Sequence, residues 1–80
     1  MRVLLFARVR ELVGGHEAVT LDLPPGATVG MLRTALIAQW PGLTALVPRC
    51  RIAVQHEFAD DDVVIDPEAE VAVIPPVSGG

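Results

Sequence analysis

One segment with helical periodicity, residues 29–40, limits the folds open to this chain of 80 residues, because strand-like segments lie on both sides of it. The apolar residues that share one face of this helix are Val29, Leu32, Ala35, Leu36, Ile37 and Trp40. Thr28 is the expected N-cap, and Pro41-Gly42 ends the helix. Residues 8–13 predict only a short helical turn, so we expect one domain with one main helix.

Strands are predicted before and after this helix. Residues 2–7 contain an unbroken apolar run, which is typical of a central strand covered on both faces, and residues 17–23 alternate between apolar and polar side chains. After the helix, residues 51–55 and 71–74 are predicted strands, with a short one at 63–65. This order predicts an α+β fold of the β-grasp (ubiquitin-like) type. We expect a mixed sheet of about five strands, with the main helix packed on one face and the last strand near the first.

The end of the sequence predicts a slender tail. Two prolines follow the last strand, and they end sheet pairing because they lack a backbone donor. Two glycines close the sequence, and the absence of a Cβ atom makes their profile narrow. Fully extended, residues 75–80 reach roughly 20 Å. We therefore predict a β-grasp domain over 1–74 and an extended tail over 75–80 that can enter a narrow channel; a frayed chain end is the alternative.

Charge and composition exclude several classes of partner. The net charge is −4 without a basic stripe, so nucleic acid and anionic membrane surfaces are not expected partners. Apolar runs of about five residues are too short to span a bilayer. Arg8 and Arg10 interrupt the apolar start, which argues against a signal peptide and favours a cytoplasmic location. All six basic residues are arginines, so the chain has no lysine.

The body of the chain lacks a recognisable catalytic or metal-binding motif. His16, His56 and Cys50 do not have metal-ligand spacing, and Cys50 is expected to be a small buried residue. The acidic run 60–62 lacks the glycine and the closing glutamate of a calcium loop. Ser78 is the only serine, and no nucleophile–histidine–acid arrangement accompanies it. We therefore expect no metal site and no catalytic machinery in the protein itself.

Chemistry at the terminal carboxyl group requires a partner. The α-carboxylate of Gly80 is ionised at neutral pH and resists nucleophilic attack. Activation as an acyl-adenylate would give it a leaving group, and sulfide could then replace the adenylate to leave a thiocarboxylate. Gly79 and Gly80 suit this chemistry because no side chain hinders the acyl carbon.

Two long segments, residues 3–12 and 70–80, resemble the small subunit of molybdopterin synthase, the MoaD family. Residues 26–29 and 52–54 are also similar to that family, so the resemblance covers nearly the whole chain. Its most specific part is the ending Pro-Pro-Val-Ser-Gly-Gly. The resemblance implies a ubiquitin-like sulfur carrier with no bound cofactor, which is adenylated by a MoeB-like enzyme that uses ATP. It further implies a sulfur donor system and a MoaE-like large subunit, with which the chain would form a heterotetramer. In that complex the sulfur would pass to cyclic pyranopterin monophosphate, a step of molybdenum cofactor biosynthesis.

The resemblance also assigns site residues by position. It implies that Gly80 carries the adenylate and then the thiocarboxylate, and that Gly79 threads into the partner with it. The residues that it implies for partner binding are Phe6, Arg10, Ile74, Pro75, Pro76, Val77 and Ser78. One departure is Gln55, which stands where the family often has asparagine.

Three alternatives remain open. The chain could be a carrier for another pathway, such as a thiamine-type carrier, although residues 8–12 occupy the place of the turn that those carriers have after the first strand. It could be a ubiquitin-like modifier of other proteins, although the lack of lysine excludes lysine-linked chains of this protein on itself. It could also be a β-grasp interaction module whose tail is never activated. If it belongs to an enzyme, it is the sulfur-donating subunit of a sulfurtransferase.

Overall fold

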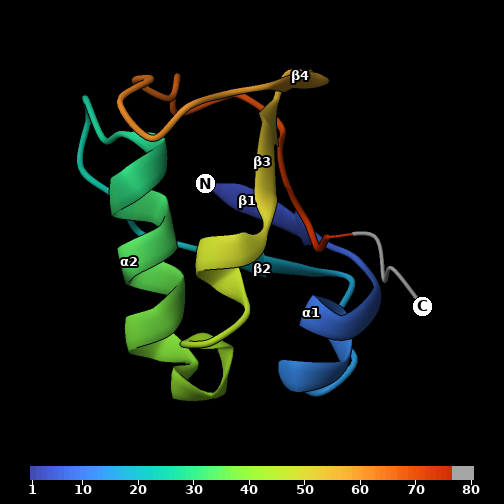
Figure 1. Ribbon diagram of the computed structural model, residues 1–80. Coiled ribbons are helices and arrows are strands. Elements are labelled where there is room, and N and C mark those ends of the chain that lie inside the picture. Colours follow the sequence, from blue (N-terminus) through green and yellow to red (C-terminus); the bar gives the residue numbers. More distant parts are fainter. Residues whose placement is uncertain (77–80) are drawn as a thin grey trace.

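The computed structural model describes residues 1–76, and its centre is a five-stranded mixed sheet in the order β2-β1-β5-β3-β4 (Figure 1). The strands are β1 (Arg2–Leu5), β2 (Ala18–Thr20), β3 (Arg51–Val54), β4 (Glu57–Phe58) and β5 (Val71–Ile74). β1 and β5 are parallel, whereas the pairs β1–β2, β3–β5 and β3–β4 are antiparallel. The last strand therefore lies beside the first, and the β-grasp prediction is confirmed.

The main helix α2 (Val29–Gln39) lies along one face of the sheet (Figure 1). Thr28 caps it as predicted, because the Thr28 hydroxyl oxygen accepts a hydrogen bond from the Met31 amide at 3.2 Å. The helix ends at Trp40, where Pro41 begins the first of two short 3₁₀ turns, η1 (Pro41–Leu43) and η2 (Val47–Arg49). A short helix, α1 (Ala7–Leu12), follows β1, and the helical turn predicted over 8–13 is thus confirmed with slightly different bounds.

The core lies between α2 and the face of the sheet that the helix covers. Its members are apolar residues that alternate along the strands or recur on the helix: Val3, Leu5, Val71, Val73, Ile52, Val29, Leu32 and Leu36, all at most 1% exposed. Full burial of such a side chain stabilises the fold by about 1.5–3 kcal/mol. In a chain of 80 residues each of these contacts is a substantial part of the total stability.

The opposite face of the sheet is open, and the expectation that the first strand is covered on both faces is wrong. Leu4 in β1 and Ala72 in β5 are only half-buried, although both strands are paired on both edges. The single main helix covers one face, and residues 1–76 place no second layer on the other. An apolar run in the sequence is thus compatible with a face that stays in contact with solvent.

The short fourth strand does not lie at 63–65 as predicted. β4 is Glu57–Phe58, and Val64 makes only an isolated bridge with Thr28. Segment 63–65 instead bonds to the start of α2: the Val63 carbonyl accepts from the Val29 amide at 3.0 Å. Within this segment only Ile65 enters the core, so its apolar residues line a helix terminus instead of pairing in the sheet.

Candidate functional site

The strand that leads into the predicted tail lies inside the sheet. β5 pairs with β1 on one edge and with β3 on the other, and its last residue, Ile74, is opposite Arg51. Pro75 and Pro76 follow as half-buried residues outside any strand. The predictions for Val77, Ser78, Gly79 and Gly80 fall outside the described residues and stay predictions.

A shallow apolar hollow lies on the open face of the sheet beside the end of β5. It has a volume of about 370 Å³ and is lined by Leu4, Phe6, Ala53, His56, Phe58, Glu70, Ala72 and Ile74. Small residues of the central strands form its floor. Phe6 and Phe58 stand at its margin, 40% and 55% exposed respectively. Exposed aromatic side chains around an apolar floor are typical of a protein–protein contact surface.

The structure brings together two of the residues that the resemblance assigned to partner binding. Phe6 and Ile74 both line the open-face hollow. Arg10 occupies a different position: its side-chain Nε donates a hydrogen bond to the carbonyl of Leu5 at 3.2 Å, which ties α1 to the end of β1. Arg10 does not line the hollow, and its role in partner binding stays a prediction.

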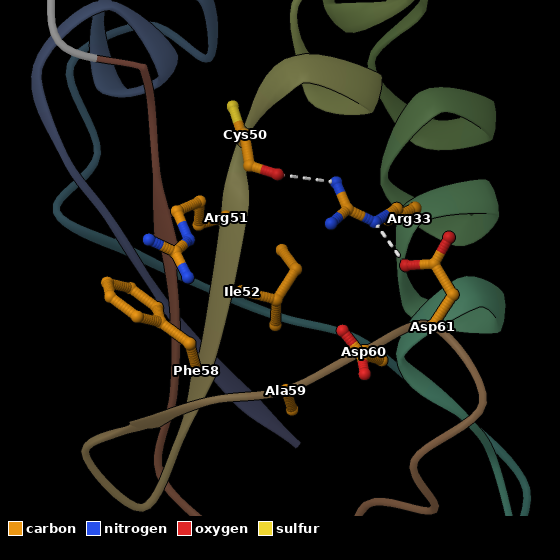
Figure 2. Close-up of a pocket in the computed structure, with 8 residues that line it drawn as sticks. All are labelled: Arg33, Cys50, Arg51, Ile52, Phe58, Ala59, Asp60 and Asp61. Atoms are coloured by element: carbon orange, nitrogen blue, oxygen red, sulfur yellow. Dashed lines mark hydrogen bonds and ion pairs between the residues drawn. The ribbon is translucent and has the colours of Figure 1, made fainter.

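A second, more polar hollow of about 460 Å³ lies between β3, α2 and the segment that follows β4 (Figure 2). Arg33 of α2 forms its inner wall. The guanidinium group of Arg33 donates to the carbonyls of Val47 and Cys50 at 2.6 and 2.9 Å and to the carboxylate of Asp61 at 2.8 Å. Its side chain is only 17% exposed, so these bonds hold α2 against the turn before β3.

Cys50 is a buried structural residue, as predicted from its isolation in the sequence. Its thiol donates to the carbonyl of Leu46 at 3.3 Å. Burial raises the pKa of the Cys50 thiol above its ordinary value, and the charges of Arg33 and Arg49 oppose this shift only in part. A thiol that stays protonated at neutral pH is a poor nucleophile and a poor metal ligand.

The described residues do not assemble a metal centre. Within 1–76 no group of three or more His, Cys, Asp or Glu side chains lies close enough to hold a metal ion. His16 and His56 are both exposed and lie in separate connections between elements. No helix in this part of the chain is long and apolar enough to cross a membrane.

Sequence reasoning missed a stacked pair at the margin of the open face. The guanidinium carbon of Arg51 lies 3.7 Å from the centroid of the Phe58 ring. Phe58 is opposite Ala53 in the β3–β4 pairing, and Arg51 lies two residues along β3 on the same side of the sheet. The pair could be predicted only by recognising that Phe58 belongs to a strand next to β3. That strand, β4, is two residues long and therefore shows no periodicity in the sequence.

Comparison with known proteins places this fold in a family. The model of the ThiS family matches residues 3–80. The chain belongs to the ThiS family. A relative from Arabidopsis thaliana, the molybdopterin synthase sulfur carrier subunit, is 36% identical over 80 residues that cover all of this chain and 82% of the relative. The protein of the same name from Escherichia coli K12 is 38% identical over 90 residues that cover all of this chain and 99% of the relative.

The resemblance to molybdopterin synthase small subunits is therefore confirmed for this ThiS-family chain. A solved structure of similar fold is SAMP1 from Haloferax volcanii, with a TM-score of 0.83 and 30% identity. That match covers 99% of this chain and 97% of SAMP1. Sulfur carrier subunits and SAMP1 are thus built on the same fold as this chain.

Proposed function

We propose that this chain is the sulfur carrier subunit of a molybdopterin synthase, acting in the cytoplasm in molybdenum cofactor biosynthesis. The observation that carries the proposal is the match over the full length of the chain to sulfur carrier subunits of that enzyme. Two structural findings support it. β5 leads from the centre of the sheet into the proline pair, and the described residues contain no metal cluster or reactive thiol that would suggest independent chemistry.

The proposed chemistry takes place at Gly80 and uses the active sites of partners. A carboxylate oxygen attacks the α-phosphorus of ATP on a MoeB-like adenylating enzyme, pyrophosphate leaves, and an acyl-adenylate forms. Sulfide from a donor system then attacks the acyl carbon, and AMP leaves with the electron pair of the C–O bond. The thiocarboxylate sulfur attacks a carbon of the pyranopterin substrate and displaces an oxygen leaving group, which departs with the electron pair of its C–O bond. Water then cleaves the acyl C–S bond, which leaves the sulfur on the substrate as a thiolate and restores the carboxylate of Gly80. The carrier needs no bound cofactor, because the ATP belongs to the activating partner.

The open face supplies a docking surface for the large subunit, for which we propose a MoaE-like protein in a heterotetramer. Phe6, Phe58 and Ile74 border the hollow on this face, and β5 continues from it into the tail. A partner that covers the hollow would therefore also lie beside the point where β5 ends and Pro75 follows.

A mass measurement tests this proposal. The full chain is incubated with its adenylating enzyme, ATP and a sulfur donor, and intact-protein and peptide masses are recorded. We expect the replacement of one oxygen atom by sulfur at Gly80, and no change in a variant that lacks Gly80. An unchanged mass for the full chain, with an adenylating enzyme that is active on another carrier, would contradict the proposal and favour an interaction module whose tail is not activated.

A second candidate function is modification of other proteins. The observation that favours it is the similarity to SAMP1, whose name is small archaeal modifier protein 1. Activation of Gly80 would be shared, but the acyl group would pass to a lysine of a target protein. Tagged chain expressed in its own organism would then appear in covalent conjugates that survive denaturation and thiol reduction. The absence of such conjugates, together with the expected sulfur mass, would leave the carrier function alone.

A further inference from the structure

We propose that Arg51 determines partner specificity by pairing with a carboxylate of the large subunit, an inference that rests on the sulfur-carrier function proposed above. Arg51 is the first residue of β3 and lies opposite Ile74, the last residue of β5. It is therefore beside the point where the chain leaves the sheet. Its guanidinium group lies over the ring of Phe58, which borders the open-face hollow.

Two arginines near the second hollow are used differently. Arg33 directs its donors inward, to two backbone carbonyls and to Asp61. Arg51 is exposed, and its guanidinium group has no hydrogen bond or ion pair to any residue in 1–76. Figure 2 shows the pair of Arg51 and Phe58 on one side of β3, with Arg33 and Asp61 on the other side beside α2. The donors of Arg51 are thus available to a partner.

The stack on Phe58 prepares Arg51 for a bidentate contact. A guanidinium group that lies on an aromatic ring keeps its N–H donors in one plane, and these donors match the two oxygens of a carboxylate. Holding the side chain in place before binding reduces the conformational entropy lost in the complex. The apolar floor beside the stack excludes water once a partner covers it, and this strengthens the ion pair.

Charges around Arg51 limit the direction from which the carboxylate can approach. Asp60 and Asp61 line the second hollow, so an acidic group entering from that side would be repelled. Glu70 lines the open-face hollow, but it precedes β5, four residues or about 13 Å along the strand from the level of Arg51. The end of the open face next to the tail thus carries Arg51, whereas the far end carries Glu70 together with the oppositely charged Arg2, which lines a hollow with Glu70. A partner with an acidic side chain near its tail-binding channel therefore meets, at the tail end of the open face, an arginine without a carboxylate partner in residues 1–76.

Binding of the full chain to the large subunit encoded in the same genome tests this inference. Dissociation constants are measured by calorimetry at low and high salt for the unaltered chain and for Arg51→Glu, Arg51→Gln and Arg51→Lys. We expect Arg51→Glu to weaken binding about tenfold or more and to reduce the salt dependence. Arg51→Lys should fall between the unaltered chain and Arg51→Gln, because an ammonium group cannot make the planar bidentate contact.

Arg8→Glu is the matched control. It changes the net charge equally, but Arg8 lies on α1, pairs with Glu11 at 3.3 Å and lines neither the open-face hollow nor the second hollow, whereas Arg51 lines the second hollow and lies over Phe58, which borders the open-face hollow. We expect it to leave the dissociation constant within about twofold. Equal effects of the Arg8 and Arg51 reversals, or no effect of Arg51→Glu, would overturn the inference while the proposed function stands. Failure of the unaltered chain to bind the large subunit would overturn both.

Discussion

Replacing Arg33 with methionine will measure how strongly one buried guanidinium group holds the main helix in place. Methionine keeps most of the apolar stem, so the change removes the hydrogen bonds to Val47, Cys50 and Asp61 with little loss of packing volume. Two of these bonds join a charged donor to a backbone carbonyl of a buried residue. Removing this donor leaves the Cys50 carbonyl without a partner in residues 1–76, whereas the Val47 carbonyl still accepts from the Cys50 amide at 3.1 Å.

The expected loss can be worked from the geometry. Hydrogen bonds to a charged group contribute about 1.5–3 kcal/mol each, and partial access of water lowers this, so Arg33→Met should cost about 2–4 kcal/mol. The ion pair contributes less, because the Asp61 side chain is 66% exposed. Asp61→Asn should therefore cost at most about 1 kcal/mol. In a domain of this size, the larger loss lowers the melting temperature by about 10 °C or more.

Thermal and urea unfolding of the two variants, at low and high salt, tests this reasoning. The effect of Asp61→Asn should shrink as salt rises, because an exposed ion pair is screened. The effect of Arg33→Met should persist, because the carbonyl bonds are shielded from solvent. If the two variants lose equal stability, or if salt removes the effect of Arg33→Met, the guanidinium group does not act through the backbone carbonyls.

Two further predictions follow from burial. Burial raises the pKa of the Cys50 thiol in the folded state, so the unfolded chain loses this proton first as pH rises, and stability should fall above about pH 8.5. The chain has no lysine or tyrosine to titrate in that range, so melting curves between neutral and alkaline pH should show this slope in the unaltered chain and a smaller one in Cys50→Ala; equal slopes would contradict the assignment. In β5, Ile74→Asp should weaken binding to the large subunit while the domain stays folded, whereas Val73→Asp should unfold it, because Val73 is fully buried in the core and Ile74 lines the open face. Calorimetry and circular dichroism check this pair, and equal unfolding by both would refute the two-faced description of the strand.

The sequence was sufficient for the fold because its signals are local. Helical spacing over 29–40, bounded by Thr28 and Pro41, located the main helix and its cap. The apolar last strand was predicted to lie near β1 because both of its faces would need cover; the pairing with β1 is confirmed, although one of those faces is open. These features depend on side chains that are close in sequence, and they determine the element order directly.

The parts that sequence reasoning missed depend on contacts between distant residues. The sequence of an apolar strand does not show whether its second face is covered by its own domain or left open. The open face around Leu4 was therefore not predicted. Val63 and Val64 suggested a strand, but their segment bonds to the start of α2. Arg33 and Arg51 are both isolated arginines in the sequence. Only the fold shows that Arg33 bonds to backbone carbonyls inside the domain, whereas Arg51 lies over the exposed ring of Phe58.

The position of β5 has a mechanical consequence. A pull on the chain beyond Pro76 acts along a strand that is bonded to β1 and β3 on its two edges. Because the force runs parallel to both ladders, it loads their hydrogen bonds together in shear and does not open them one at a time. Two ladders loaded at once resist unravelling of the body, which suits the insertion of the tail into partner enzymes that we propose.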